Sequence, residues 1–179
     1  MPTVAALNKF NSRDALLRLL RAGLATAIID GLFSSVLSVA AYDSTVSRLF
    51  QGVAATLVGS SAFDGGARTT ALGMLMHCGV AFLWSAIFIF GVMRSAWIQK
   101  VLASRFGALK VAAAYGPAIW LVMSLIVIPV LVHRPPNISI RWWVQLFGHF
   151  PFVGVPIVAS ASRAASRFNG EPTPKPSAA

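Results

Sequence analysis

The chain has 179 residues, of which 56% are hydrophobic and only 11% are charged, and its formal net charge is +10. Average soluble domains carry roughly a quarter charged residues, so this composition excludes an ordinary soluble domain and indicates a membrane protein. The single cysteine, Cys78, excludes an internal disulfide.

Residues 1–21 precede the first apolar run and are polar to amphipathic. Asn11 and Ser12 are typical helix N-caps, so we predict a helix that starts near Arg13 and continues into the first span. Leucines alternate with basic residues over this stretch. We therefore expect an amphipathic N-terminal segment at the cytoplasmic interface.

Four apolar runs of about 20 residues follow, each long enough to cross roughly 30 Å of hydrocarbon as a helix. The fold predicted from them is all-α, an integral membrane four-helix bundle within residues 22–161. The first run exceeds the length of a signal-peptide core, and we expect it to be retained. The predicted spans are residues 22–41, 71–92, 111–132 and 142–161.

The connection between the first two spans contains an uncharged stretch, Leu49–Phe63. Its length, about 15 residues, is too short for an ordinary span. We predict a short interfacial or re-entrant helix that ends at Gly59. Asp64-Gly65-Gly66 then forms a turn into the second span.

The third span is expected to stop at Arg134-Pro135-Pro136-Asn137, which cannot continue a helix. Trp142 and Trp143 then fit an outer aromatic belt. Pro129, Pro151 and Pro156 are expected to kink their helices. Gly116, Gly148 and Gly154 are interpreted as close-packing positions. Residues 162–179 are predicted to form a disordered cytoplasmic tail, because 169–179 are polar and Pro-rich.

The basic residues flank the spans unevenly. The N-terminal segment, the connection Arg94–Lys110 and the tail hold 11 of the 15 Lys and Arg residues. The positive-inside rule therefore predicts that both termini and the middle connection are cytoplasmic. Because the basic residues lie beside the spans, we expect no nucleic acid partner and predict contact with the lipid bilayer. A homodimer or a partner membrane protein is also possible.

A polar stripe runs along the first span. Thr26, Asp30, Ser34 and Ser38 recur every four residues and so share one helical face. A charged Asp at mid-span costs about 2.5–3.5 kcal/mol on insertion scales, which favours a face turned into the bundle.

The other spans offer polar partners for Asp30: His77, Gln145 and His149. Counting along each span places the two histidines nearly level and Asp30 a turn or two deeper. We therefore predict an internal polar network of Asp30, Ser34, Ser38, His77, Gln145 and His149.

Several interpretations of this network remain open. It can fix helix register, or it can handle protons or ions. Asp and His are also legitimate metal ligands, and two histidines on different helices are a necessary condition for haem. The spacings match no metal motif, and no nucleophile signature is present. We therefore expect no metal, no cofactor and no catalytic residue.

Four segments resemble a known group. They read RLFQGVAATLVGSSAFDGG, ALGMLMHCGVAF, WLVMSLIVIP and GHFPFVGVPIV. Together they resemble a group of small bacterial four-span inner-membrane proteins with no known activity. The matching positions include Asp30, Gly59, His77 and His149. The resemblance implies an inner-membrane location and supplies no activity.

The sequence thus predicts a non-enzymatic multi-pass protein of a bacterial inner membrane whose polar network is structural or proton-sensing. The alternative is a small transporter or channel subunit for protons or a small solute. A haem-binding membrane subunit is the less favoured third hypothesis.

Overall fold

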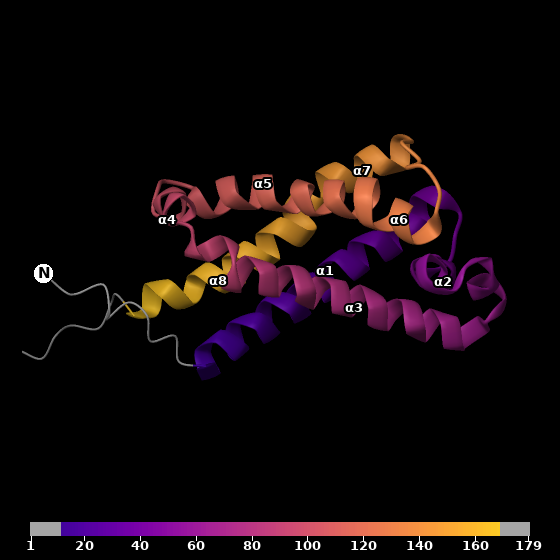
Figure 1. The fold of residues 1–179 in the computed structure, drawn as a ribbon, viewed down its shortest axis with the longest axis horizontal. Helices are drawn as coiled ribbons and strands as arrows, with labels where there is room; N and C mark the ends of the chain where they lie inside the picture. Colours follow the sequence, from indigo (N-terminus) through magenta and orange to yellow (C-terminus); the bar gives the residue numbers. More distant parts are fainter. Residues whose placement is uncertain (1–11, 169–179) are drawn as a thin grey trace, which may run out of the picture.

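The computed structural model describes residues 12–168, and these residues form helices joined by short turns, with no strand among them (Figure 1). The all-α prediction is confirmed. The α-helices are α1 (Ser12–Tyr42), α2 (Val46–Val58), α3 (Gly66–Phe90), α4 (Ala96–Leu102), α5 (Gly107–Val122), α6 (Ile128–Val132), α7 (Ile140–His149) and α8 (Val155–Phe168). Two 3₁₀ turns, η2 (Ser60–Asp64) and η3 (Val92–Arg94), and two π-helical segments, η4 (Met123–Val127) and η5 (Phe150–Gly154), complete the chain.

Four continuous helical stretches are long and apolar enough to cross a membrane, so the protein is a multi-pass membrane protein. Their outer faces are apolar, as contact with lipid requires. On α1, for example, Leu32 is 62% exposed and Val36 is 65% exposed. The stretches are Arg13–Tyr42, Gly66–Arg94, Gly107–Val132 and Ile140–Ser162.

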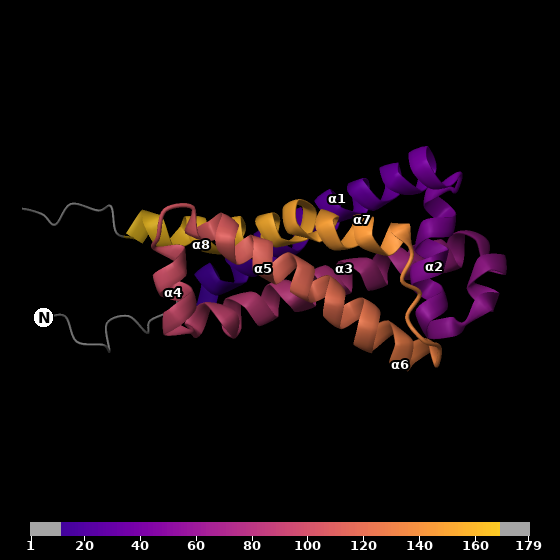
Figure 2. The same cartoon turned by 90° about the horizontal axis from the view of Figure 1, so that it is seen from above.

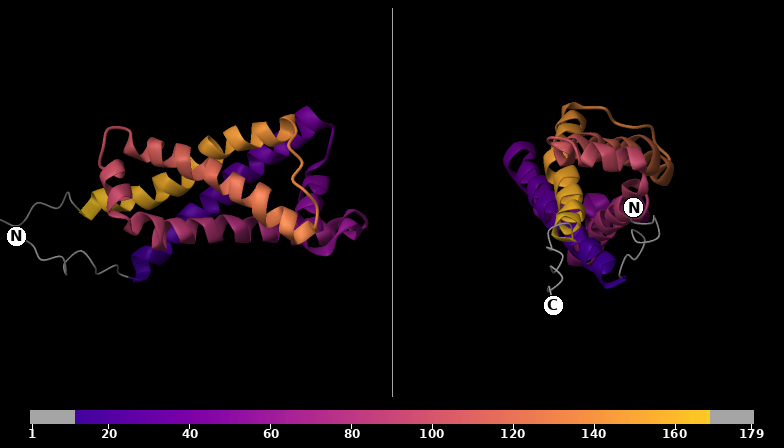
Figure 3. Two further views of the ribbon diagram at one scale, coloured as in Figure 1. Left: turned by 45° about the horizontal axis from the view of Figure 1, so that its top comes forward. Right: turned by 90° about the vertical axis from the view of Figure 1, so that its left-hand side faces the viewer.

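The long helices cross one another instead of running parallel (Figure 3). Helix α1 packs against both α3 and α8, and α8 with η5 packs against α5. The start of α1, the end of α8 and α4 lie at one end of the molecule, whereas α2 and the connection between α6 and α7 lie at the other (Figures 1 and 2).

Helix α2 is the predicted short helix of the first connection. It lies across the end of the bundle, transverse to the long helices (Figure 2). Its N-cap Thr45 accepts a hydrogen bond from the Arg48 backbone N–H, and it ends at Gly59, whose φ of 74° suits glycine. A Cβ at Gly73 of α3 would overlap the carbonyl oxygen of Phe50, so the two backbones touch.

Glycines also bring the third and fourth spans into backbone contact. A Cβ at Gly116 of α5 would overlap the carbonyl oxygen of His149, and one at Gly154 would overlap that of Ala112. A Cβ at Gly148 would meet the ring of Phe33. The close-packing interpretation of these three glycines therefore holds, and small residues serve close approach as in other membrane bundles.

The prolines coincide with π-helical turns. The segment η4 comes directly before α6, which contains Pro129, and η5 contains Pro151 and precedes Pro156. A wider turn accommodates a residue that lacks the backbone N–H. Pro117 lies inside α5, a position that the sequence analysis did not single out.

Three expectations differ from the structure. Helix α8 continues to Phe168, so residues 162–168 are helical instead of a disordered tail, and residues 169–179 lie outside the described part. The middle connection contains α4, which was not predicted. Trp142 is 8% exposed and packs inward, whereas Trp143 is 47% exposed and suits an interfacial belt.

Candidate functional site

The polar stripe of α1 faces the bundle interior. Thr26 is 2% exposed, Ser38 is 7% exposed, and the Asp30 side chain is 15% exposed. The apolar residues Ile28 and Leu32, which lie between these positions along the helix, are more than half exposed. The period-four spacing therefore turns one polar face inward and leaves the apolar face to lipid.

His77 of α3 meets this stripe at Asp30. Its Nδ1 lies 3.9 Å from Oδ2 of Asp30, and its Nε2–H donates a hydrogen bond of 3.0 Å to the backbone carbonyl of Ala27. Gly31 leaves room for the ring, since a Cβ there would sit 3.4 Å from Nε2. Phe50 of α2 packs edge-on against the same imidazole, with ring centroids 5.9 Å apart. Three helices thus hold His77 in place.

His149 at the end of α7 is the third member of the cluster. It is buried, and its Nδ1–H donates to the backbone carbonyl of Gln145 at 2.7 Å. The charges of Asp30 and His149 interact, as do those of Asp30 and His77. Asp30 therefore lies within electrostatic reach of two imidazoles that come from two other spans.

The hydrogen bonds of His77 define what the cluster can do chemically. A carbonyl only accepts, so the neutral ring carries its proton on Nε2 and presents the Nδ1 lone pair to Asp30. A neutral Nδ1 and an ionised carboxylate are both proton acceptors. Oδ1 of Asp30 is buried and has no hydrogen-bond partner among the described residues. One added proton, on either group, converts this acceptor–acceptor contact into an attractive pair.

The other predicted members do not join this cluster through their side chains. Ser38 is buried and Ser34 is half-buried, and neither hydroxyl hydrogen-bonds to Asp30 in the described part of the chain. Gln145 contributes its backbone carbonyl to His149, whereas its side chain lines a separate pocket. Asp30 and His77 are therefore the two predicted members whose side chains the structure brings into contact, and His149 lies within electrostatic range of Asp30.

The depth expected for Asp30 was wrong. His77 contacts both Asp30 and Ala27, so it lies level with Asp30 and not a turn or two above it. Counting residues assumed four upright spans. Helix α1 instead runs diagonally across the bundle (Figure 1), which shifts its register relative to α3.

No group of three or more His, Cys, Asp or Glu side chains in the described residues is arranged to hold a metal ion. Each histidine directs one ring nitrogen to a backbone carbonyl, and the other nitrogen of His77 faces Asp30. Both ring nitrogens of His77 are therefore already directed to other groups, which gives the haem hypothesis no support.

An aromatic cluster adjoins His149, and the sequence analysis missed it. The ring of Trp120 lies 4.8 Å from the imidazole of His149 and 6.3 Å from the ring of Trp142. Trp142 Nε1 donates to Ser124 Oγ at 3.0 Å. Trp120 and Ser124 are four apart on one helical face, and that spacing was the available signal.

Comparisons with protein-family models, with curated proteins and with solved structures each found no match to this chain.

Proposed function

We propose that the protein is a multi-pass protein of a bacterial inner membrane in which Asp30, His77 and His149 form a proton-responsive cluster. The observation that carries the proposal is the contact between Asp30 Oδ2 and His77 Nδ1 at 3.9 Å, with Nε2–H committed to the Ala27 carbonyl. Uptake of one proton changes this contact from unfavourable to attractive, and the cluster joins α1, α3 and α7.

The proposed location rests on charge placement and on the resemblance stated above. The start of α1, α4 and the end of α8 share one end of the molecule, as alternating spans require. The basic residues of the N-terminal segment and of the connection Arg94–Lys110 belong to that end, which is the cytoplasmic end in our proposal.

Tryptophan fluorescence tests the proton response directly. Trp120 packs against His149, and a protonated imidazole quenches an adjacent indole more strongly than a neutral one. We expect the emission of the purified protein to change as the pH is lowered from neutral and the imidazole takes up a proton. Trp120→Phe should remove most of this change, which assigns it to the correct indole.

Asp30→Asn is the decisive variant in this titration. An amide cannot exchange a proton and carries no charge for the imidazoles, so the fluorescence change should move to a different pH or disappear. Ser34→Ala is the matched control, because Ser34 lies one turn away on the same face and should leave the titration unchanged. A titration identical in wild type and Asp30→Asn would contradict a proton-responsive cluster.

Transport remains a second candidate because of one observation. The pocket that opens at the α2 end of the molecule ends on Trp120, whose opposite neighbour is His149. Proton flux into proteoliposomes tests it: transport through the cluster requires loss of flux in Asp30→Asn. Equal flux in both proteins removes Asp30 from any transport mechanism. Four spans are few for a solute path, so a transporting form would be a dimer.

A further inference from the structure

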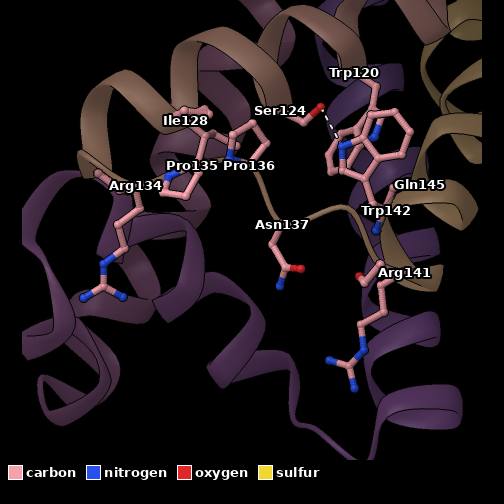
Figure 4. Close-up of a pocket in the computed structure, with 13 residues that line it drawn as sticks. Trp120, Ser124, Ile128, Arg134, Pro135, Pro136, Asn137, Arg141, Trp142 and Gln145 are labelled. Atoms are coloured by element: carbon pink, nitrogen blue, oxygen red, sulfur yellow. Dashed lines mark hydrogen bonds between the residues drawn. The ribbon is translucent and has the colours of Figure 1, made fainter.

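A pocket of about 430 Å³ opens between α5–α6 on one side and α7 on the other (Figure 4). Its volume falls within the range of small-molecule sites, about 300–1,000 Å³. The pocket lies at the end of the molecule where α2 is found, and the connection between α6 and α7 forms its rim (Figure 2). Asp30 and His77 do not line it, although two of its lining residues, Trp120 and Gln145, contact His149.

The walls of the pocket are apolar and aromatic. Trp120, Trp142 and Ile128 line it, and the hydrogen bond from Trp142 to Ser124 fixes one indole in position. Nε1 of Trp120 is buried and has no hydrogen-bond partner in the described chain.

The rim of the pocket is positively charged. Arg134 and Arg141 stand on either side of the opening, with Asn137 between them (Figure 4). No Asp or Glu lines the pocket, and within the described residues neither arginine forms an ion pair with a carboxylate. Arg141 is positioned by Tyr42, whose ring centroid lies 3.9 Å below its guanidinium carbon.

Exposed apolar side chains surround this entrance. Val130 and Leu131 of α6 are exposed by 65% and 50%, and Ile140 at the start of α7 is 76% exposed. Both helices that flank the pocket therefore present apolar side chains outward, as lipid-facing helices do. A molecule with an apolar body can enter from the bilayer, with its polar head at the arginines.

We propose that this pocket binds an anionic phospholipid of the surrounding leaflet. Its phosphate lies at the positively charged rim, where Arg134 or Arg141 can pair with it through the guanidinium group. The glycerol region and upper acyl chain lie against Trp120, Trp142 and Ile128. The paired positive charge selects a lipid with net negative charge over a zwitterionic lipid.

Thermal unfolding in an uncharged detergent tests this proposal, because a ligand that binds the folded state raises Tm. We expect phosphatidylglycerol to raise Tm by about 3–5 °C, and phosphatidylcholine with the same acyl chains to raise it much less. Arg134→Gln combined with Arg141→Gln should weaken the phosphatidylglycerol response by about tenfold or more in lipid concentration. The corresponding double lysine variant keeps the charge and should retain most of the response.

The matched control is Arg48→Gln combined with Arg68→Gln, which removes the same charge from the same end of the molecule but outside the pocket. This control should respond to phosphatidylglycerol as wild type does. An equal loss in both double glutamine variants would reduce the effect to general surface charge and overturn the proposal. An equal response to phosphatidylcholine, or to inorganic phosphate alone, would also overturn it.

Discussion

Asp30 and His77 face each other as two proton acceptors, because a backbone carbonyl binds the only N–H of the neutral imidazole. The Ala27 carbonyl takes the Nε2–H of His77, so only Nδ1 remains for the carboxylate. The ring cannot turn to offer its N–H without losing that hydrogen bond and its edge-on contact with Phe50. In our proposal, the protonation state of the pair controls the contact between α1 and α3.

Asp30→Leu tests the stabilising part of this contact. Leucine leaves Nδ1 of His77 without a polar neighbour, and polar contacts between membrane helices average about 0.6 kcal/mol, with a maximum near 1.7. At an acidic pH, where the pair holds the added proton and the contact is attractive, we expect Tm in detergent to fall by about 2–4 °C. Ser34→Ala should change it by much less, because that hydroxyl bonds to no other described side chain. Equal melting of wild type and Asp30→Leu would argue against a buried pair.

For individual residues, the sequence predicted which face of α1 turns inward. It did not predict which residues of the other helices contact that face. The four-residue spacing of Thr26, Asp30 and Ser38 indicated an inward stripe, because helical periodicity fixes which residues share a face. The residues of other helices that contact this face are determined by the tilt of each helix and by the angle at which the helices cross. Residue spacing in the sequence contains no information about either. The predicted network therefore included Ser34 and Gln145, although neither side chain hydrogen-bonds to Asp30.

Contact between the third and fourth spans depends on glycine. Gly116→Ala places a methyl group against the His149 carbonyl oxygen, and two backbones cannot shift apart as a flexible side chain can. We expect a loss of about 1–3 kcal/mol, seen as a lower Tm. The control is Gly79→Ala, which meets nothing within 4 Å and should be neutral or stabilising. A stable Gly116→Ala protein would show that α5 and η5 pack less closely than described.

The attachment of α2 to α3 provides a separate test. Gly73→Ala puts a methyl group against the Phe50 carbonyl oxygen and should lift α2 from the bundle. Amide hydrogen exchange over residues 46–58 should then become faster, while exchange in α5 stays as in wild type. Unchanged protection of α2 in this variant would mean that the glycine contact does not hold it.

The elements themselves were largely readable from sequence. Length and polarity indicated the four spans, and Gly59 marked the end of α2 because few other residues adopt its positive φ. Two features had no such signal. The π-helical turns depend on how neighbouring helices accommodate proline, and α4 is a single short amphipathic stretch within a basic connection. Both arise from tertiary packing.

For the whole molecule, the proposed orientation predicts which end faces the cytoplasm. In a Cys78→Ser background, Ala67→Cys reports on the α2 end and Ala103→Cys on the α4 end, and both positions are exposed. We expect a membrane-impermeant maleimide to label Ala67→Cys in intact spheroplasts, and Ala103→Cys only after permeabilisation. The reverse labelling pattern would place the basic connection outside and contradict the proposed topology.

The central claim for the whole molecule is that the Asp30 cluster inside the bundle takes up a proton. A single experiment can measure this. Infrared difference spectra between acidic and neutral pH, recorded on the protein in lipid nanodiscs, report each carboxyl group that gains a proton through its C=O stretch. Our account predicts a band in wild type that is missing in Asp30→Asn and shifted in His77→Gln, because the imidazole of His77 contacts the carboxyl group of Asp30. Identical spectra for wild type and Asp30→Asn would show that Asp30 exchanges no proton, and would contradict the proton-responsive cluster.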